Sequence, residues 1–463
     1  MTMKTLYLAS VLCFAITVGA PSFGKAGTRA DLIPSGFSTD FQDEIPAKVK
    51  DGGGALTDSL DTDENGAPVF KADGTREPGI WGSYKYIMEH IVERALELDL
   101  YGVTSQLPQG VASFKWDWGV IAAKRRFDSH RKIGPLLAPF EFQGKEVELN
   151  LSGSGGGHTF QFSYGIIDDL DWYFELPFTY MDVSFKPNDA GSDVLCNMFP
   201  LIGRPAMYQG YSGSWLMGDI NTGFSWNLYR NSRFSVALTP RVFLPTAKLP
   251  DPNRSLTYGM GPELETGIGG WAVGFTQGYD LRIFPKGMLP WWMDIIASTE
   301  FGFSYAFEQE REYPWKFNKP AIDLAAIDPD FARMFPDLSH IKEGDTFTYR
   351  PGMGMSMITQ LQLQLAIFGL GFGYGFEHSA EAEFGSDTDA AFQQMADALE
   401  LTGTATTHAI QVAVSISLIP LYIPAEVAFQ WRKVVDGYNS IIYDDFYQLT
   451  VKGFFPVTQW FDD

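Results

Sequence analysis

From position 111 onward, hydrophobic and polar residues alternate along the chain with a period of two. Every even position from 172 to 180 carries a large apolar or aromatic residue, whereas Asp171 and Glu175 occupy odd positions. A β-strand directs successive side chains to opposite faces, so each such segment has one apolar and one polar face. The pattern therefore predicts a chain built from two-faced strands.

Thirteen segments show this pattern, at about 111–126, 145–167, 170–185, 218–230, 233–246, 256–269, 271–284, 292–307, 346–362, 364–378, 406–419, 422–434 and 442–455. Most run to about ten residues or more, the length of a tilted membrane strand, whereas soluble strands average about five or six. Many apolar faces carry Trp, Phe or Tyr near their ends, as aromatic girdles do. We predict an all-β fold, a transmembrane antiparallel β-barrel of 12 to 14 strands.

The odd number of segments conflicts with the even strand counts of bacterial single-chain barrels. One strand has therefore been missed, merged or split, and the stretch 127–167 is the expected place for an additional strand. The long connections at 186–217, 308–345 and 379–405 do not all fall on one side with this count. Hairpin turns are expected at 167–169, 230–232, 269–270 and 436–437, where turn-forming residues cluster.

The first residues have the order of a secretory signal peptide, which we assign to 1–26. Lys4 precedes an apolar stretch from Leu6 to Val18, and small residues such as Ala20 follow it. Residues 27–105 form a polar N-terminal extension with one amphipathic helix, expected at 83–100, that either plugs the lumen or lies in the periplasm. The barrel is assigned to 106–463.

The net charge of −22 argues against nucleic acid as a partner, because nucleic-acid binding needs basic patches. Only Cys196 remains after the signal peptide, so neither an internal disulfide nor a multi-cysteine zinc site is expected. No histidine pair at helical spacing, P-loop or Rossmann fingerprint is present in the sequence. We therefore expect no cofactor, no metal site, no catalytic residues and no enzymatic activity.

Function should reside on the polar strand faces, which a barrel turns toward its lumen. Charges there can pair across strands and brace the wall, or they can line a wet pore and set its selectivity. The strip Leu370, Phe372, Tyr374 and Phe376 should face lipid. The candidate pore-lining residues are Lys115, Asp117, Arg125, Asp171, Glu175, Asp219, Arg241, Glu263, Glu265, Asp280, Arg282, Glu300, Glu377, Glu426, Arg432 and Lys452.

A series of short motifs between 105 and 285 resembles the outer-membrane family of meta-pathway phenol-degradation transporters. They are LPQG at 107–110, FSYGIIDDLD at 162–171, MGDINTG at 217–223, LPT at 244–246 and YGMGP at 258–262. Ala247 stands where the family has Gly, and the chain ends WFDD where a barrel usually ends on an aromatic residue. The resemblance implies an outer-membrane channel for small hydrophobic or aromatic compounds, without catalytic residues.

Two functions follow from these observations. The first is an outer-membrane channel or transporter for small molecules, among them hydrophobic or aromatic ones. The alternative is a barrel that serves as scaffold or sheath for a partner protein, such as an electron-transfer cytochrome or a secretion component. The expected partners are outer-membrane lipid, a small-molecule solute and the barrel-assembly machinery of a Gram-negative bacterium.

Overall fold

The computed structural model describes residues 102–136, 139–142, 145–148, 150–184, 186–192, 211–212, 215–249, 267–285, 288–289, 293–313, 342–365, 367–385, 403–418, 423 and 425–456. The predicted signal peptide and the helix expected at 83–100 lie outside the described residues. Of the predicted extension 27–105, only 102–105 belong to the described part.

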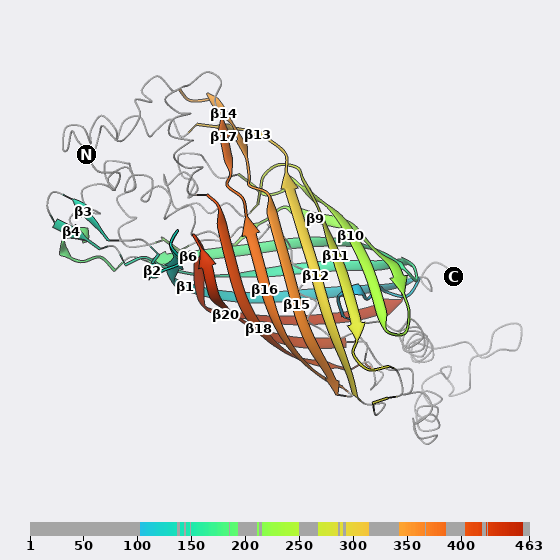
Figure 1. The fold of residues 1–463 in the computed structure, drawn as a ribbon. Coiled ribbons are helices and arrows are strands. Elements are labelled where there is room, and N and C mark those ends of the chain that lie inside the picture. The colour runs from blue at the N-terminus through green and yellow to red at the C-terminus, as the bar shows by residue number, and fades with distance from the viewer. Residues whose placement is uncertain are drawn as a thin grey trace, which may run out of the picture.

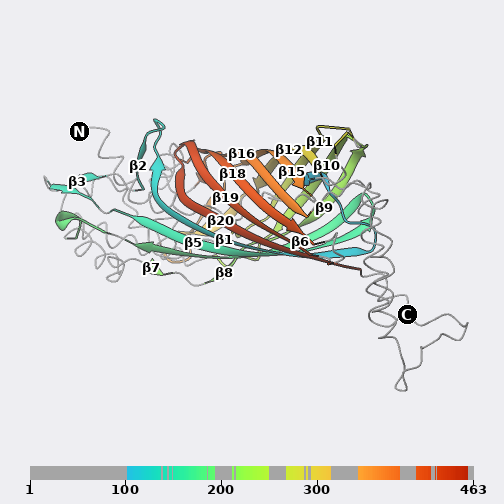
Figure 2. The same ribbon diagram turned by 90° about the horizontal axis from the view of Figure 1, so that it is seen from below.

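Twelve strands of the described chain form one closed antiparallel barrel (Figures 1 and 2). Each strand pairs with its neighbour in sequence order, and β1 pairs with both β5 and β20, so the sheet closes on itself. The prediction of a barrel with 12 to 14 strands is confirmed. The strands are β1 Val111–Phe127, β5 Ser152–Ile167, β6 Leu170–Ser184, β9 Ile220–Arg230, β10 Phe234–Leu244, β11 Ala272–Arg282, β12 Met293–Ala306, β15 Gly354–Leu365, β16 Phe368–Ser379, β18 Ala405–Ser417, β19 Ala425–Tyr438 and β20 Ile441–Pro456.

Short elements lie at the edges of this wall. A 3-10 helix, η2 Gly102–Thr104, precedes β1. The strands β2 Ile133–Pro135, β3 Phe140–Phe142 and β4 Lys145–Val147 lie between β1 and β5. β7 Tyr211–Ser212 and β8 Leu216–Met217 pair with β6. Away from the barrel wall, β13 Gln309–Glu312, β14 Thr346–Arg350 and β17 Glu383–Gly385 form a separate three-stranded sheet (Figure 1).

The pairing of β10 with β11 resolves the odd strand count. Their register runs without interruption from Phe243↔Ala272 to Phe234↔Leu281, so the wall has no strand between them. The surplus segment of the prediction is 256–269, of which residues 256–266 lie outside the described part. The expectation of an additional wall strand within 127–167 is wrong, because β5 is the single wall strand there. Alternation alone cannot separate a wall strand from a segment of similar pattern in a connection.

All the long connections leave the barrel at one end. They join β1 to β5, β6 to β9, β10 to β11, β12 to β15 and β16 to β18, whereas β5–β6, β9–β10 and β15–β16 are joined by two or three residues at the other end. Outer-membrane barrels have short periplasmic turns and longer extracellular loops. We therefore assign the short-turn end, where β1 begins and β20 ends, to the periplasm. The conflict between the thirteen segments and the side of the long connections thus came from the surplus strand.

Two of the predicted hairpin turns, at 167–169 and 230–232, join β5 to β6 and β9 to β10. The turn expected at 436–437 is wrong, because Asp436 and Gly437 lie inside β19, next to a β-bulge at which β19 has one residue more than β18. The hairpin turn follows at Asn439, which has a φ of 46°. Asn tolerates this left-handed conformation better than most residues, so the chain reverses there.

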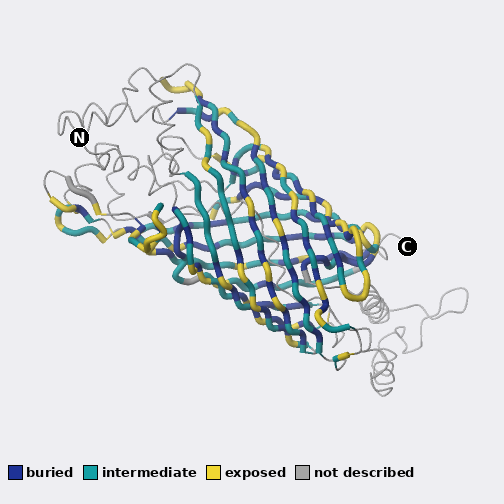
Figure 3. Tube along the Cα trace, in the orientation of Figure 1, coloured by how far each residue is buried: buried dark blue, intermediate teal, exposed yellow. Residues whose placement is uncertain are grey.

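The barrel wall buries many polar residues and exposes large apolar ones. Figure 3 shows how burial changes from residue to residue along the strands. Phe372 and Trp226 are each 52% exposed, whereas Glu426 is fully buried and Gln362 is 1% exposed. The outward direction of Phe372 and Tyr374 confirms that their strip lies on the outer face. This distribution is the reverse of a soluble protein and suits a barrel whose outer face contacts hydrocarbon. In the described part of the chain, no helix is long and apolar enough to cross a membrane.

A closed antiparallel barrel with an apolar outer face is the architecture of bacterial outer-membrane proteins. Lipid offers the backbone no hydrogen-bond partners. In a closed barrel, the N–H and C=O groups of each strand find their partners on the neighbouring strands. The outer face and the closed ladder thus place this chain in the outer membrane.

We predict that Phe372→Arg destabilises the barrel by about 2–4 kcal/mol in lipid vesicles, because it places a charge on the lipid face near the middle of β16. Urea unfolding followed by tryptophan fluorescence measures the change. Phe372→Leu, which keeps the face apolar, should shift the midpoint far less. An unchanged midpoint in the arginine variant would mean that this face does not contact lipid.

Candidate functional site

The segment 102–110, here called the strap, lies against the inner face of the barrel at its periplasmic end. Its first residues are held by the carboxylate of Asp280 on β11. The backbone N–H groups of Val103 and Thr104 donate to Asp280 at 3.3 and 2.7 Å, and the Thr104 hydroxyl donates to the same carboxylate at 2.6 Å. Asp280 is 1% exposed, so the start of the strap is fixed by a buried acceptor.

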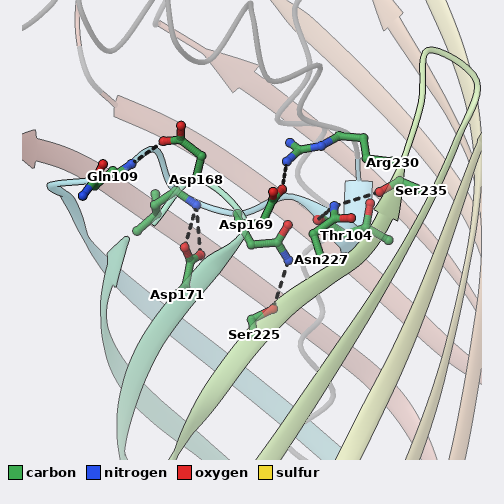
Figure 4. A network of polar contacts seen from close by, with 11 residues as sticks. Thr104, Gln109, Asp168, Asp169, Asp171, Ser225, Asn227, Arg230 and Ser235 are labelled. Atoms are coloured by element: carbon green, nitrogen blue, oxygen red, sulfur yellow. Dashed lines mark hydrogen bonds and ion pairs between the residues drawn. The ribbon is translucent and has the colours of Figure 1, made fainter. Parts of the chain in front are cut away.

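The next part of the strap is held by β9 (Figure 4). The Gln106 side-chain Nε2 donates to the Ser225 hydroxyl at 3.2 Å, and Asn227 Nδ2 donates to the Thr104 carbonyl at 3.3 Å. Asn227 also donates to Ser235 on β10 at 2.9 Å. These neutral hydrogen bonds tie the middle of the strap to two adjacent strands.

The strap ends at β6 and the β5–β6 turn. The Leu107 N–H donates to both carboxylate oxygens of Asp171, at 3.0 and 2.9 Å, and the Gln109 N–H donates to Asp168 at 2.9 Å (Figure 4). Gly110, with a φ of 78°, then leads the chain into β1. From β11 through β9 and β6 to β1, the strap follows about half of the ring of strands.

Glycine at position 165 allows the strap to approach β5. A Cβ atom there would lie 2.2 Å from the Pro108 carbonyl oxygen, a distance that no side chain tolerates. The Gly110 N–H donates to the Gly165 carbonyl at 2.9 Å, so the contact is between backbones. The two motifs 107–110 and 162–171 of the sequence analysis therefore lie against each other in space.

Above the strap, charged side chains on the inner faces of β1 and β6 form a connected group. Lys115 Nζ lies 3.2 Å from the Asp117 carboxylate, and Asp117 accepts hydrogen bonds from Gln448 at 3.1 Å and from Thr450. Because these residues belong to β1 and β20, they link the two strands that close the barrel.

Glu175 on β6 accepts a hydrogen bond from Asn221 Nδ2 at 2.5 Å and lies within electrostatic reach of Lys115 and Arg241. Arg241 on β10 lies along the wall over Gly274. A Cβ atom on Gly274 would meet its Nε at 3.2 Å. Acidic and basic groups from several strands thus meet in one region of the lumen.

Other inner charges form short ion pairs. Arg282 Nε donates to Asp294 at 2.8 Å near the periplasmic end, and Arg432 lies 2.8 Å from Glu377. Such pairs brace neighbouring strands. Glu300 on β12 is 5% exposed.

On the last two strands, the fully buried Glu426 accepts a hydrogen bond from Ser417 at 3.4 Å. The Lys452 ammonium lies 4.8 Å from the centre of the Phe454 ring, a cation–π contact.

The remaining candidates lie toward the outer end or outside the described residues. The side chain of Arg125, beyond a β-bulge, is 52% exposed and pairs with Asp444. Asp219 accepts hydrogen bonds from the backbone N–H groups of Ala247 and Ile268, and so holds the β10–β11 connection. Glu263 and Glu265 lie outside the described residues.

The sequence analysis missed the uncharged polar groups of the site. It selected Asp171 and Asp280, but it did not select Ser225 and Asn227, which also hold the strap, or Gln106 of the strap itself. It also omitted a set of inner glutamines because it considered only charged residues. The alternation of the strands would have identified these glutamines, because the two residues that flank each of them along its strand are directed outward. The glutamines are Gln360, Gln362, Gln411 and Gln430.

Within the described chain, no group of three or more His, Cys, Asp or Glu side chains could hold a metal ion. Two inner carboxylates bind the backbone of the strap, and the charged side chains above it lie on the inner faces of the strands. The candidate site is therefore the lumen itself.

No family model matches the chain, and no curated protein matches it. The motif resemblance thus stays a prediction from sequence. Solved structures that are similar include an outer-membrane channel from Pseudomonas putida F1, with 11% identity and a TM-score of 0.47, covering 76% of this chain and 98% of that one.

Two further solved structures are the CymD monoaromatic hydrocarbon channel and the NanC porin. CymD has 9% identity and a TM-score of 0.27, covering 79% of this chain and 91% of its own. NanC has 8% identity and a TM-score of 0.28, and the match covers 74% of this chain and 98% of the NanC chain. At these identities the similarity concerns the fold alone.

We predict that Asp280→Asn loosens the strap, because one charged acceptor there receives three hydrogen bonds. Loss of the charge should lower the free energy of local opening of the strap by about 2 kcal/mol. The amide of Thr104 should then exchange about 30 times faster. Hydrogen–deuterium exchange of the refolded barrel measures it. Asp444→Asn, at the outer end beside Arg125, is the matched control and should leave Thr104 unchanged. Equal protection in both variants would show that Asp280 does not hold the strap.

Proposed function

We propose that the protein is an outer-membrane channel for small molecules, among them hydrophobic or aromatic ones. The observation that carries the proposal is the reversed barrel, in which an apolar outer face surrounds a lumen lined by charged and polar side chains. A wall of this kind dissolves in lipid and offers a wet path through it. The resemblance of the motifs at 107–110 and 162–171 supports hydrophobic or aromatic solutes as cargo.

Within this proposal, the contacts of the inner charged residues separate those with a structural role from those suited to select solutes. The pairs Arg282–Asp294 and Arg432–Glu377 brace the wall, and Asp171 and Asp280 hold the strap. The group around Lys115 and Glu175 draws charges from several strands and is the part suited to selecting solutes by charge.

The alternative function, a sheath for a partner protein, requires a lumen wide enough for a folded or threaded chain. Even barrels of 16 to 18 strands enclose only an aqueous channel, and this one has twelve. The strap also lies inside the barrel at its periplasmic end. The geometry therefore favours small solutes over a protein partner.

We predict discrete single-channel openings when the refolded full chain is inserted in planar bilayers. A chain lacking residues 27–105 should show larger steps, because the deletion removes the strap residues that contact β11. The absence of conductance from both proteins, each folded as judged by heat-modifiable mobility on gels, would contradict the open channel.

We predict that Lys115→Gln raises the cation-to-anion permeability ratio by about fivefold, because a unit charge a few ångströms from a permeating ion contributes on the order of 1 kcal/mol in a water-like medium. The reversal potential under a KCl gradient measures this ratio. Lys433→Gln, the same change on an outward-directed side chain of β19, is the control. Identical reversal potentials in the two variants would show that Lys115 does not act on ions in the channel.

A further inference from the structure

A group of uncharged amides lies on the inner wall opposite the charged region. Gln360 and Gln362 on β15, Gln411 on β18 and Gln430 on β19 are all buried, whereas Leu361, between the first two, is 48% exposed on the outer face. The alternation of burial fixes the direction of these side chains toward the lumen.

The strand register brings these amides together around β16. Gln360 is paired with Gly373, and Gly373 with Gln411, so two amides flank one glycine. One row away, Gln362 is paired with Gly371. Adjacent strands are about 4.8 Å apart, so the backbones of β15 and β18 are separated by about 10 Å.

Glycine at position 373 leaves room for an amide against the inner wall. A Cβ atom on Gly373 would lie 2.6 Å from Gln411 Nε2, which shows that this amide lies directly over the glycine. Gly373 therefore forms a floor on which the Gln411 amide lies. A Cβ atom on Gly371 would meet only Ala413, at 3.6 Å, so the inner wall beside Gln362 carries no side chain at that position. A larger residue at 373 would displace Gln411.

Several of these amide atoms have no hydrogen-bond partner among the described residues. They are Gln360 Oε1, both Gln362 side-chain atoms and Gln411 Nε2. The one amide contact within the group is between Gln430 Nε2, which donates, and Gln411 Oε1, at 3.0 Å. Unpaired buried donors and acceptors are costly, so a solute that completes their hydrogen bonds would be stabilised at this wall.

We propose that Gln360, Gln362 and Gln411, beside Gly371 and Gly373, form a binding station for a small uncharged solute that carries hydroxyl groups. The inference rests on the proposed channel function and names a solute class for one wall of it. A hydroxyl group both donates and accepts, which matches an amide that presents an NH₂ and a carbonyl oxygen.

Two other solute classes fit this wall less well. A hydrocarbon would leave the amide atoms unpaired, at the full cost of their desolvation. An anion would need a free cation, and the nearest one in the register, Arg432 opposite Gln411, pairs with Glu377 at 2.8 Å. The uncharged hydroxylated solute is therefore the class that satisfies the station.

Saturation-transfer NMR on the full-length refolded barrel tests the station, with glycerol, glycerate and toluene as probes. Glycerol should receive saturation in preference to the other two. Gln362→Leu should weaken glycerol binding about fivefold, the effect of one lost hydrogen bond. The matched control is Gln277→Leu, since Gln277 on β11 is directed outward, and it should bind glycerol like the unchanged protein. Equal binding in both variants, or saturation of toluene that depends on Gln362, would overturn the station.

A glycine variant gives a second test that leaves the amides in place. Gly373→Ala should displace Gln411 and weaken glycerol binding, whereas Gly119→Ala, whose Cβ would meet only the Tyr447 carbonyl at 3.7 Å, should not. Bilayer conductance measured on the same samples separates the two proposals. Open channels without Gln362-dependent glycerol binding would refute the station alone. Glycerol binding in a protein that never conducts would refute the channel and leave the station.

Discussion

The hydrogen-bonded seam between β1 and β20 is the contact on which the rest of the structure depends. It runs from Val111↔Pro456 to Arg126↔Ile441 and joins the two ends of the sheet. Without it, two strand edges would present unpaired backbone groups to lipid, where no solvent could satisfy them. On the inner side, Asp117 of β1 accepts hydrogen bonds from Gln448 and Thr450 of β20, so the seam is reinforced by side chains as well as by the backbone ladder.

Closure determines what the two faces of the wall can do. The outer face needs only to be apolar, and large exposed side chains such as Phe372 and Trp226 serve there. The inner face has to satisfy its polar groups within a narrow space, which it does by ion pairs, by hydrogen bonds to the strap and by glycines that leave room for longer neighbours. The lumen is therefore divided into a periplasmic strap, a charged region around Lys115 and an amide wall around Gln362.

The strap shows how a chain segment outside the wall becomes part of the passage. It carries its own backbone donors to Asp171 and Asp280, two acceptors that would otherwise be charged groups facing the lumen. Gly165 permits the closest approach. A segment so attached lies against the inner wall at the periplasmic end, and its hydrogen bonds hold it there.

The sequence by itself determined the fold class and the direction of individual side chains. A period of two assigns each residue to a face, and the segment length of about ten residues identifies a wall that crosses a membrane. The tertiary structure alone decided the strand count and the partners. The segment 256–269 shows the same alternation as the wall strands, and only the direct pairing of β10 with β11 excludes it from the wall. Thr104 and Asp280 are 176 residues apart, and Leu107 and Asp171 are 64 apart. Periodicity gives a residue its face but not the strand opposite to it, because that neighbour depends on the closure of the whole ring.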